Sequence, residues 1–149
     1  VFYNANSTNG SCVAGTLSSN AVTWGSVQIF NSTAVSTQVN IVHHTPSGKS
    51  VIVWGNSSGD EYAYAVTATL TGTVFSFGNS TIISKNPGGT TVKTKDIGAV
   101  YDPVANQIFV AFHDATAGVD DGTSVNLTID GNTITGTNGY VFQTQGGME

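Results

Sequence analysis

An internal repeat runs through this sequence and limits the folds open to it. Residues 13–25 (VAGTLSSNAVTWG) align without a gap on residues 66–78 (VTATLTGTVFSFG), so that Gly25 falls on Gly78. A third copy begins at Val125. Each unit is long enough for four short strands, which is the content of one propeller blade or one four-stranded meander. The chain is therefore predicted to be built from similar small sheets.

A second block repeats with slightly longer spacing, because residues 46–53 (PSGKSVIV) lie over residues 103–110 (PVANQIFV). The opening segment Val1-Phe2-Tyr3 takes the place of residues 51–53, so the chain begins within a unit. The predicted organisation is a single repeat-built β domain over residues 1–149, with a partial unit at about 1–20, a full unit at about 21–72, a full unit at about 73–131 and a partial unit at about 132–149.

The residue usage favours β-strands throughout. Leu occurs three times and Glu twice, and no stretch has apolar residues at helical spacing without Gly or β-branched interruptions. Runs rich in Val, Ile, Thr, Phe and Tyr alternate with turn clusters such as Asn86-Pro87-Gly88-Gly89. The predicted strands of the two full units are 22–30, 39–45, 50–54 and 62–70, then 74–83, 97–101, 107–112 and 123–129.

The third predicted strand of each full unit is apolar at successive positions, at residues 51–54 and 108–112. Such strands are typically buried on both faces, and burial of Ile52 or Phe109 contributes on the order of 1.5 to 3 kcal/mol. We therefore predict an all-β fold of tandem four-stranded antiparallel meanders, propeller-blade-like, packed face to face as a sandwich with open edges at both ends.

The aromatic-Gly corners at residues 22–25 and 75–78, the Pro turn Tyr101-Asp102-Pro103 and the doubly apolar strand that follows it form a recurring pattern. This pattern resembles the propeller-like tandem repeats of phage tail fibres and of environmental extracellular fibre proteins. The resemblance implies a surface-exposed repetitive β-protein used for adhesion or fibre building. Because a closed propeller needs at least about four blades, the chain is either an excerpt of a longer protein or is completed by neighbouring chains.

Open strand edges are templates for pairing with another chain. In the favoured interpretation the segment Val1, Phe2 and Tyr3 supplies a strand to the next copy, so that a head-to-tail contact propagates as a filament, a homopolymer of this chain. The alternatives are a segment of a larger fibre, an independent compact sandwich, and a carbohydrate-binding module of lectin or tail-fibre adhesin type, whose partner is a surface carbohydrate.

Charge and hydropathy exclude two classes of partner. The 4 basic residues are all Lys and face 9 acidic ones, for a net charge of -5, so no basic surface is available to bind nucleic acid. No apolar run approaches the roughly 20 residues of a membrane span, and no membrane insertion is expected. Abundant Ser, Thr, Gly and Asn with few charges is typical of extracellular proteins and of virion or cell surfaces. The single Cys12 is expected to be a small buried residue.

Six Asn-X-Ser/Thr sequons are candidates for N-linked glycans, and most lie in or beside predicted turns that have room for a sugar. Unmodified turn asparagines are the alternative. The sequons are at Asn6, Asn9, Asn31, Asn56, Asn79 and Asn126.

No metal site is expected from the ionisable residues. His43 and His44 are adjacent in a predicted strand, so their imidazoles point to opposite faces. The carboxylates of Asp114, Asp120 and Asp121 beside His113 could hold Ca²⁺, but their spacing does not match an EF-hand. Calcium is therefore the weaker interpretation of this loop.

The chain is also not expected to be an enzyme or to need a cofactor. It has no Gly-X-Ser-X-Gly elbow, and nothing in the spacing of Asp102, Asp114 and Asp120 favours a carboxylate pair for glycoside hydrolysis. Three aromatic residues could stack on sugars or could belong to one core face, and alternation along a strand favours the core. They are Trp54, Tyr62 and Tyr64.

Overall fold

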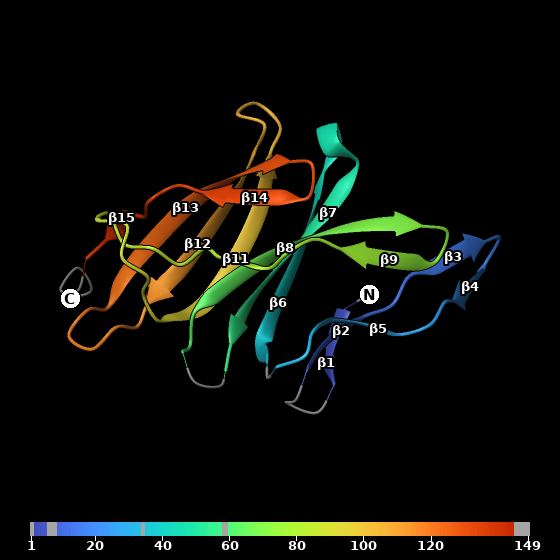
Figure 1. Cartoon of the computed structure of the whole chain (residues 1–149), viewed down its shortest axis with the longest axis horizontal. Helices are drawn as coiled ribbons and strands as arrows, with labels where there is room; N and C mark the ends of the chain where they lie inside the picture. The colour runs from blue at the N-terminus through green and yellow to red at the C-terminus, as the bar shows by residue number, and fades with distance from the viewer. Residues whose placement is uncertain (1, 6–8, 34, 58–59, 145–149) are drawn as a thin grey trace.

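The computed structural model describes residues 2–5, 9–33, 35–57 and 60–144, and it consists of antiparallel β-strands joined by turns (Figure 1). Within these ranges there is no α-helix, and a single 3-10 turn, η1 (Thr45–Ser47), lies between two strands. None of the helical structure in the described part of the chain is long and apolar enough to cross a membrane. The prediction of an all-β chain is confirmed.

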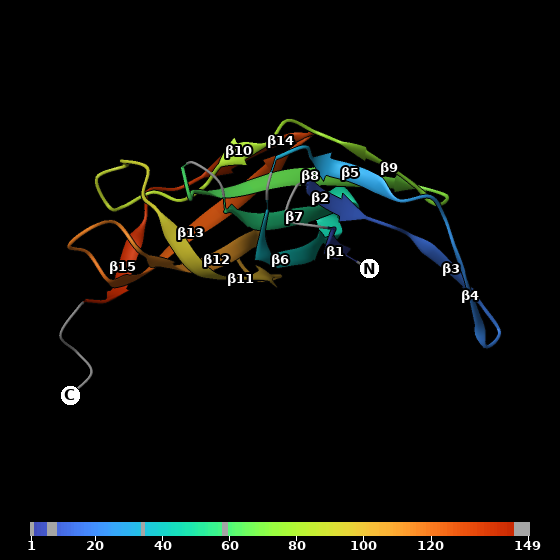
Figure 2. The ribbon, with the colours of Figure 1, turned by 90° about the horizontal axis from the view of Figure 1, so that it is seen from below.

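The first sheet lies near the N-terminus and has the strand order β1-β2-β5. Its strands are β1 (Phe2–Ala5), β2 (Asn9–Cys12) and β5 (Gln28–Asn31). Between β2 and β5 the chain forms a separate hairpin of β3 (Gly15–Ser18) and β4 (Ala21–Trp24). This hairpin projects from one end of the molecule, as Figure 2 shows. Among the described strands, β3 and β4 pair only with each other.

The second and third sheets share one topology, in which three long antiparallel strands are followed by two short strands that both pair with the third. The second sheet contains β6 (Val35–His44), β7 (Lys49–Asn56), β8 (Ala63–Thr71), β9 (Val74–Phe77) and β10 (Thr81–Ile82). The third contains β11 (Thr94–Asp102), β12 (Gln107–Asp114), β13 (Asp121–Asp130), β14 (Thr133–Gly136) and β15 (Tyr140–Gln143).

The three copies of the repeat make the same backbone contacts. After each hairpin, one amide N–H donates to the carbonyl at the equivalent repeat position before the hairpin: Gly25 to Ala14 at 2.8 Å, Gly78 to Thr67 at 3.0 Å, and Thr137 to Asn126 at 2.9 Å. The hairpin turns also share a left-handed residue, at Ser19, Gly72 and Gly131, with φ of 55°, 62° and 56°. Glycine adopts this conformation at least cost, which accounts for its presence in two of the three turns.

The predicted strands 22–30 and 74–83 exist as two short strands each, but they pair backward along the chain. β4 and β5 pair with β3 and β2, and β9 and β10 both pair with β8. These strands therefore come last in their sheets, whereas the repeat pattern predicted them as the first strands of the units beginning at about residues 21 and 73. The physical reason is that a tight hairpin returns the chain onto the strand it has just left.

Strand pairing also shifts one of the predicted alignments by a residue. Val51 lies opposite Thr67, and Phe109 lies opposite Asn126, the repeat equivalent of Thr67. Val51 therefore corresponds to Phe109. The alignment of residues 46–53 with 103–110 had predicted Ile108 at this position. Because successive side chains alternate between faces, this single residue exchanges the two faces of the strand.

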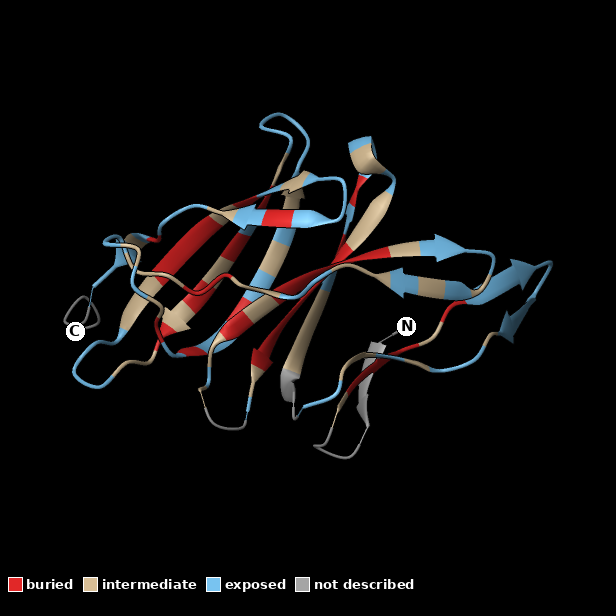
Figure 3. Ribbon diagram, viewed as in Figure 1, coloured by how far each residue is buried: buried red, intermediate tan, exposed pale blue. Residues whose placement is uncertain are grey.

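Apolar packing joins the sheets in series. Val51 and Val53 of the second sheet are fully buried in one cluster with Ile108 and Val110 of the third sheet. The opposite face of the second sheet carries Ile52 and Trp54, and β5 of the first sheet packs against it through Phe30. The second sheet is therefore covered on both faces (Figure 3). This agrees with the prediction that the strand at residues 51–54 is buried on both sides.

A glycine at the end of the aromatic-Gly corner allows this close stacking. A Cβ on Gly78 would lie 2.6 Å from the backbone oxygen of Asn132, in the β13–β14 turn of the next sheet. A Cβ on Gly25 would lie 2.7 Å from Cβ of Thr73, the equivalent turn residue of the second sheet. Both distances are shorter than real Cβ contacts, so each sheet packs on its neighbour at a position that has no side chain.

Substitution of Gly78 by Ala is expected to lower the free energy of unfolding by about 1 to 3 kcal/mol, because the added methyl overpacks a contact made by backbone. The matched control is Gly88→Ala, where the added Cβ would meet only Asn86 Oδ1 at 3.4 Å. Urea denaturation at low protein concentration measures both. Equal midpoints for the two variants would contradict the stacking role of Gly78.

Candidate functional site

The third sheet has a face that no other sheet of the described residues covers. This outer face is the side of β11, β12, β13 and β15 turned away from the second sheet. It carries four large side chains with substantial exposure: Val100 at 57%, Phe109 at 39%, Tyr140 at 71% and Phe142 at 53%. Val100 and Phe109 are direct cross-strand partners, and the ring of Phe142 lies over Gly122. Soluble proteins seldom leave apolar side chains grouped in this way without a use.

The repeat shows what this face corresponds to elsewhere in the molecule. By strand pairing, Val100 and Phe109 are equivalent to Val42 and Val51, which also pair with each other. Phe142 is equivalent to Ile83, two residues beyond the equivalent pairs Thr81–Ala65 and Tyr140–Ser124. The second-sheet residues are 7%, 0% and 0% exposed, since the third sheet covers them. The outer face is thus a stacking surface without its neighbour.

One prediction is corrected by this finding. The strand at residues 108–112 was expected to be buried on both faces, but only Ile108, Val110 and Phe112 are buried, and Phe109 is exposed. The doubly apolar sequence is the same as in β7, but β12 lies in the last sheet of the stack. No further sheet within the described residues packs on that side.

The projecting β3–β4 hairpin forms the opposite end of the stack. Leu17, Val22 and Trp24 are 71%, 45% and 53% exposed, and Leu17 pairs with Val22 across the hairpin. The indole of Trp24 lies over Gly15, where a Cβ would come within 2.7 Å of the ring. By the gapless repeat, Val22 and Trp24 are equivalent to Phe75 and Phe77, which pack in the cluster between the first and second sheets. The equivalent surface of the second sheet is therefore covered by the first sheet, whereas that of the hairpin is exposed.

The predicted assembly strand is Val1, Phe2 and Tyr3. Val1 lies outside the described residues, whereas Phe2 and Tyr3 pair with Cys12 and Ser11 of β2 in the same chain. β1 is the end strand of the first sheet. The first sheet has no counterpart of β6 or β11 among the described strands, so the outer edge of β1 is the position where such a strand would pair.

The predicted sequons lie in different surroundings. Asn6 is outside the described residues, and Asn9 is half-buried at the start of β2. Asn31 donates from its amide to the carbonyl oxygen and Oγ1 of Thr33, at 3.0 and 2.9 Å. Asn79 is exposed between β9 and β10, whereas Asn126 lies directly opposite Phe109 on the outer face.

Asn56, the remaining sequon, belongs to a polar cluster around Asp60. Its amide donates to Asp60 Oδ1 at 2.9 Å, the Tyr62 N–H donates to the same oxygen, and the Tyr64 hydroxyl donates to Oδ2. Partial burial alone would raise the pKa of Asp60, but these hydrogen bonds lower it below its ordinary 3.8. Burial, together with the bond to Asp60, raises the pKa of Tyr64 to about 12.

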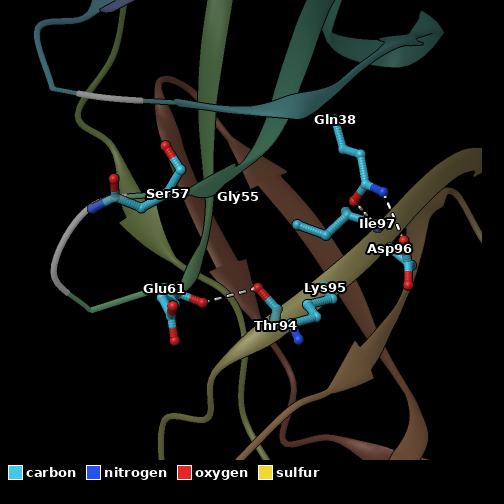
Figure 4. Close-up of a pocket in the computed structure, with 9 residues that line it drawn as sticks. Gln38, Gly55, Ser57, Glu61, Thr94, Lys95, Asp96 and Ile97 are labelled. Atoms are coloured by element: carbon cyan, nitrogen blue, oxygen red, sulfur yellow. Dashed lines mark hydrogen bonds between the residues drawn. The ribbon is translucent and has the colours of Figure 1, made fainter. Parts of the chain in front are cut away.

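A polar hollow of about 260 Å³ lies where the second and third sheets meet (Figure 4). Its polar groups hold the two sheets together. Gln38 donates to Asp96 Oδ1 at 2.7 Å and accepts from the Ile97 N–H at 3.0 Å, and Thr94 donates from N and Oγ1 to the Glu61 carbonyl oxygen. The hollow is therefore a hydrogen-bonded seam between sheets.

The other candidate residues for chemistry are spread over the molecule. His43 is exposed and His44 buried, on opposite faces as predicted. His113 Nε2 contacts Asp120 Oδ1, while Asp114 accepts from the Thr116 N–H. Asp102 accepts the amides of a turn, from Val104 and Ala105. No group of three or more His, Cys, Asp or Glu side chains suited to a metal ion occurs in the described ranges.

The aromatic residues first weighed as sugar platforms are partly core. Trp54 is 1% exposed and stacks on Tyr64 with ring centroids 5.7 Å apart. Tyr62 is half-buried. The surface aromatics that sequence reasoning missed are Tyr140 and Phe142. The signal for them was the repeat itself, since both lie on the face of the third sheet that is equivalent to a buried face of the second sheet.

Comparison with models of protein families, with curated proteins and with solved structures found no match to this chain. The resemblance to propeller-like fibre repeats remains a prediction from the sequence.

The Asp60 cluster leads to a prediction of pH dependence. The pKa of Asp60 is lowered in the folded state, so its ionised carboxylate stabilises the fold at pH values above the ordinary pKa of 3.8. This stabilisation is lost as the pH falls through the lowered pKa of the folded state. Asp60→Asn is expected to cost about 1 kcal/mol of unfolding free energy at pH 7, the size of one hydrogen bond. Urea denaturation from pH 7 to pH 3 should show this difference shrinking on acidification. A constant difference would contradict it.

Proposed function

We propose that this chain is a structural subunit of an extracellular β-rich filament or fibre, in which copies stack head to tail. One observation carries the proposal: the exposed outer face of the third sheet is equivalent, residue by residue, to the face of the second sheet that the third sheet buries. The partner that fits such a face best is another unit of the same repeat, and in this proposal a second copy of the chain supplies it.

The two open surfaces lie at opposite ends of the molecule (Figure 2). The β3–β4 hairpin is at one end, and the outer face with β15 is at the other. A contact between two different surfaces is heterologous, so it leaves one surface of each kind free on every dimer. Copies can then be added at both ends along one axis, which produces a filament. Pairing of another strand with the outer edge of β1 would add to this contact.

The proposed location is extracellular or on a virion or cell surface. It is supported by the low content of charged residues, 9% of the chain, and by the fibre repeats that the sequence resembles. The role is structural, without enzymatic activity or a cofactor. N-linked glycans on the exposed sequons fit the same setting.

A carbohydrate-binding module is the second candidate, and one feature favours it. A hollow of about 440 Å³ on the outer face places the rings of Phe109 and Tyr140 beside the polar side chains of Asp102, Ser124 and Asn126. Aromatic faces with nearby hydrogen-bonding groups suit a sugar ring. Saturable binding of an oligosaccharide to a monodisperse protein would favour this function over filament assembly.

Assembly is tested with a matched pair of variants. Val100→Ser combined with Phe142→Ser removes apolar groups from the outer face, and Val104→Ser changes a valine that is 95% exposed in the β11–β12 turn. Loss of burial worth roughly 1.5 kcal/mol or more should raise the concentration needed for assembly at least about tenfold. Sedimentation velocity and electron microscopy measure this, with Val104→Ser expected to assemble like the wild type. A monomeric wild type, or an outer-face variant that assembles normally, would overturn the proposal.

Glycan occupancy should depend on the position of each sequon. A glycan on Asn126 would stand over Phe109 and keep a second copy from the outer face, whereas one on Asn79 is exposed between two short strands. Glycopeptide mass spectrometry of sedimented filaments is expected to find Asn126 unmodified, with any Asn126-linked glycan in the unassembled fraction. Asn79 serves as the internal comparison. Equal occupancy of Asn126 in filaments and supernatant would contradict the stacking of this face.

A further inference from the structure

We infer that the β3–β4 hairpin of one copy docks on the outer face of the third sheet of the next copy, with Val22 against Tyr140 and Trp24 against Phe142. This inference rests on the proposed function and names the surfaces that meet. It follows from contacts that the chain already makes twice within itself.

The first of these contacts joins the first and second sheets. Phe77 of β9 packs on Phe30 of β5 with ring centroids 6.4 Å apart. The Phe75 N–H donates to Gln28 Oε1 at 2.6 Å. The short strand β9 of the second sheet thus packs on β5, the last strand of the first sheet.

The second contact joins the second and third sheets through the equivalent hairpin, in which Gly136 stands where β9 has Phe77. Ile134 of β14, the equivalent of Phe75, is 3% exposed and lies in the core cluster that contains Ile83, the equivalent of Phe30. The turn before it contributes a polar contact, since the Thr67 hydroxyl donates to the Asn132 carbonyl oxygen at 3.1 Å. At both internal junctions the hairpin of one sheet therefore packs on the preceding sheet, with different side chains.

The same rule applied to the ends of the chain pairs the residues left over. Val22 and Trp24 stand where β9 has Phe75 and Phe77, and Tyr140 and Phe142 stand where β5 has Gln28 and Phe30. Trp24, Tyr140 and Phe142 are each more than half exposed. These surfaces lie at opposite ends of the molecule, so in the proposed filament the third contact of this kind forms between copies (Figure 1).

One residue makes the contact between copies differ from those within the chain. Thr137 occupies the position of Gly25 and Gly78, and its Oγ1 accepts from the Asn126 N–H at 3.1 Å. The incoming turn at Asn20 therefore meets a side chain and must sit farther from the sheet than Thr73 or Asn132 does. The β3–β4 hairpin pairs with no other described strand, so backbone hydrogen bonds to a larger sheet do not fix its angle to the rest of the molecule.

Cysteine cross-linking tests the pairing. Val22→Cys and Tyr140→Cys are made as separate single variants, mixed under assembly conditions and oxidised. We expect covalent dimers from the mixture and little product from either variant alone. The matched control replaces Val22→Cys by Thr23→Cys, whose side chain points to the other face of the hairpin. Burial raises the pKa of Cys12 to about 11, so the native thiol remains unreactive.

Tryptophan quenching supplies a second measurement that needs no cysteine. The chain has 2 Trp residues, and Trp54 is buried, so acrylamide reaches only Trp24 in the monomer. Assembly should protect Trp24 from the quencher. In Trp24→Phe, which introduces the residue found at the equivalent position of β9, assembly should persist and leave the quenching of Trp54 unchanged.

The outcomes separate this inference from the proposed function. If filaments form but Trp24 stays accessible, or Thr23→Cys cross-links as well as Val22→Cys, the hairpin docking is wrong and the filament proposal stands. If no assembly occurs under any condition, the proposed function fails and the docking fails with it. Protected Trp24 together with cross-linking selective for Val22 establishes the docking.

Discussion

The stacking of one sheet on the next is the contact on which this structure depends. The second sheet is apolar on both faces, with Val51 and Val53 on one side and Ile52 and Trp54 on the other, so it needs a neighbour on each side. The first sheet covers one side through Phe30, and the third sheet covers the other through Ile108 and Val110. Small sheets of this kind are stable because they are packed in series.

Stacking in series leaves the two ends of the row exposed. Repeat proteins commonly end in units with a polar outer surface, which stops growth and keeps the protein soluble. The described end sheets instead expose Phe109 and Phe142 at one side and Trp24 at the other. The two glycines that admit a neighbour, Gly25 and Gly78, are followed by Thr137 at the last position, so the final junction is related to the internal ones without being identical.

Much of the fold was predictable from the residues, and two features were not. The strand positions, the turns and the apolar character of β7 follow from β-branched runs and from turn residues, which act locally. The phase of the repeat does not, because a periodic sequence looks the same wherever it is cut, and only the return of β9 onto β8 fixes the sheet boundary. The register of β12 likewise depends on which residue meets Asn126, and a shift by one residue exchanges its faces.

By itself the sequence determined an all-β chain, repeated in units with apolar strands, low in charge and carrying six possible glycan sites. Local propensity and alternation are enough for those conclusions. Only the tertiary structure decided that Val51 is buried while its equivalent Phe109 is exposed, and that Trp54 is core while Trp24 is surface. The physical reason is that burial depends on whether a neighbouring sheet is present, which a unit's own residues do not encode.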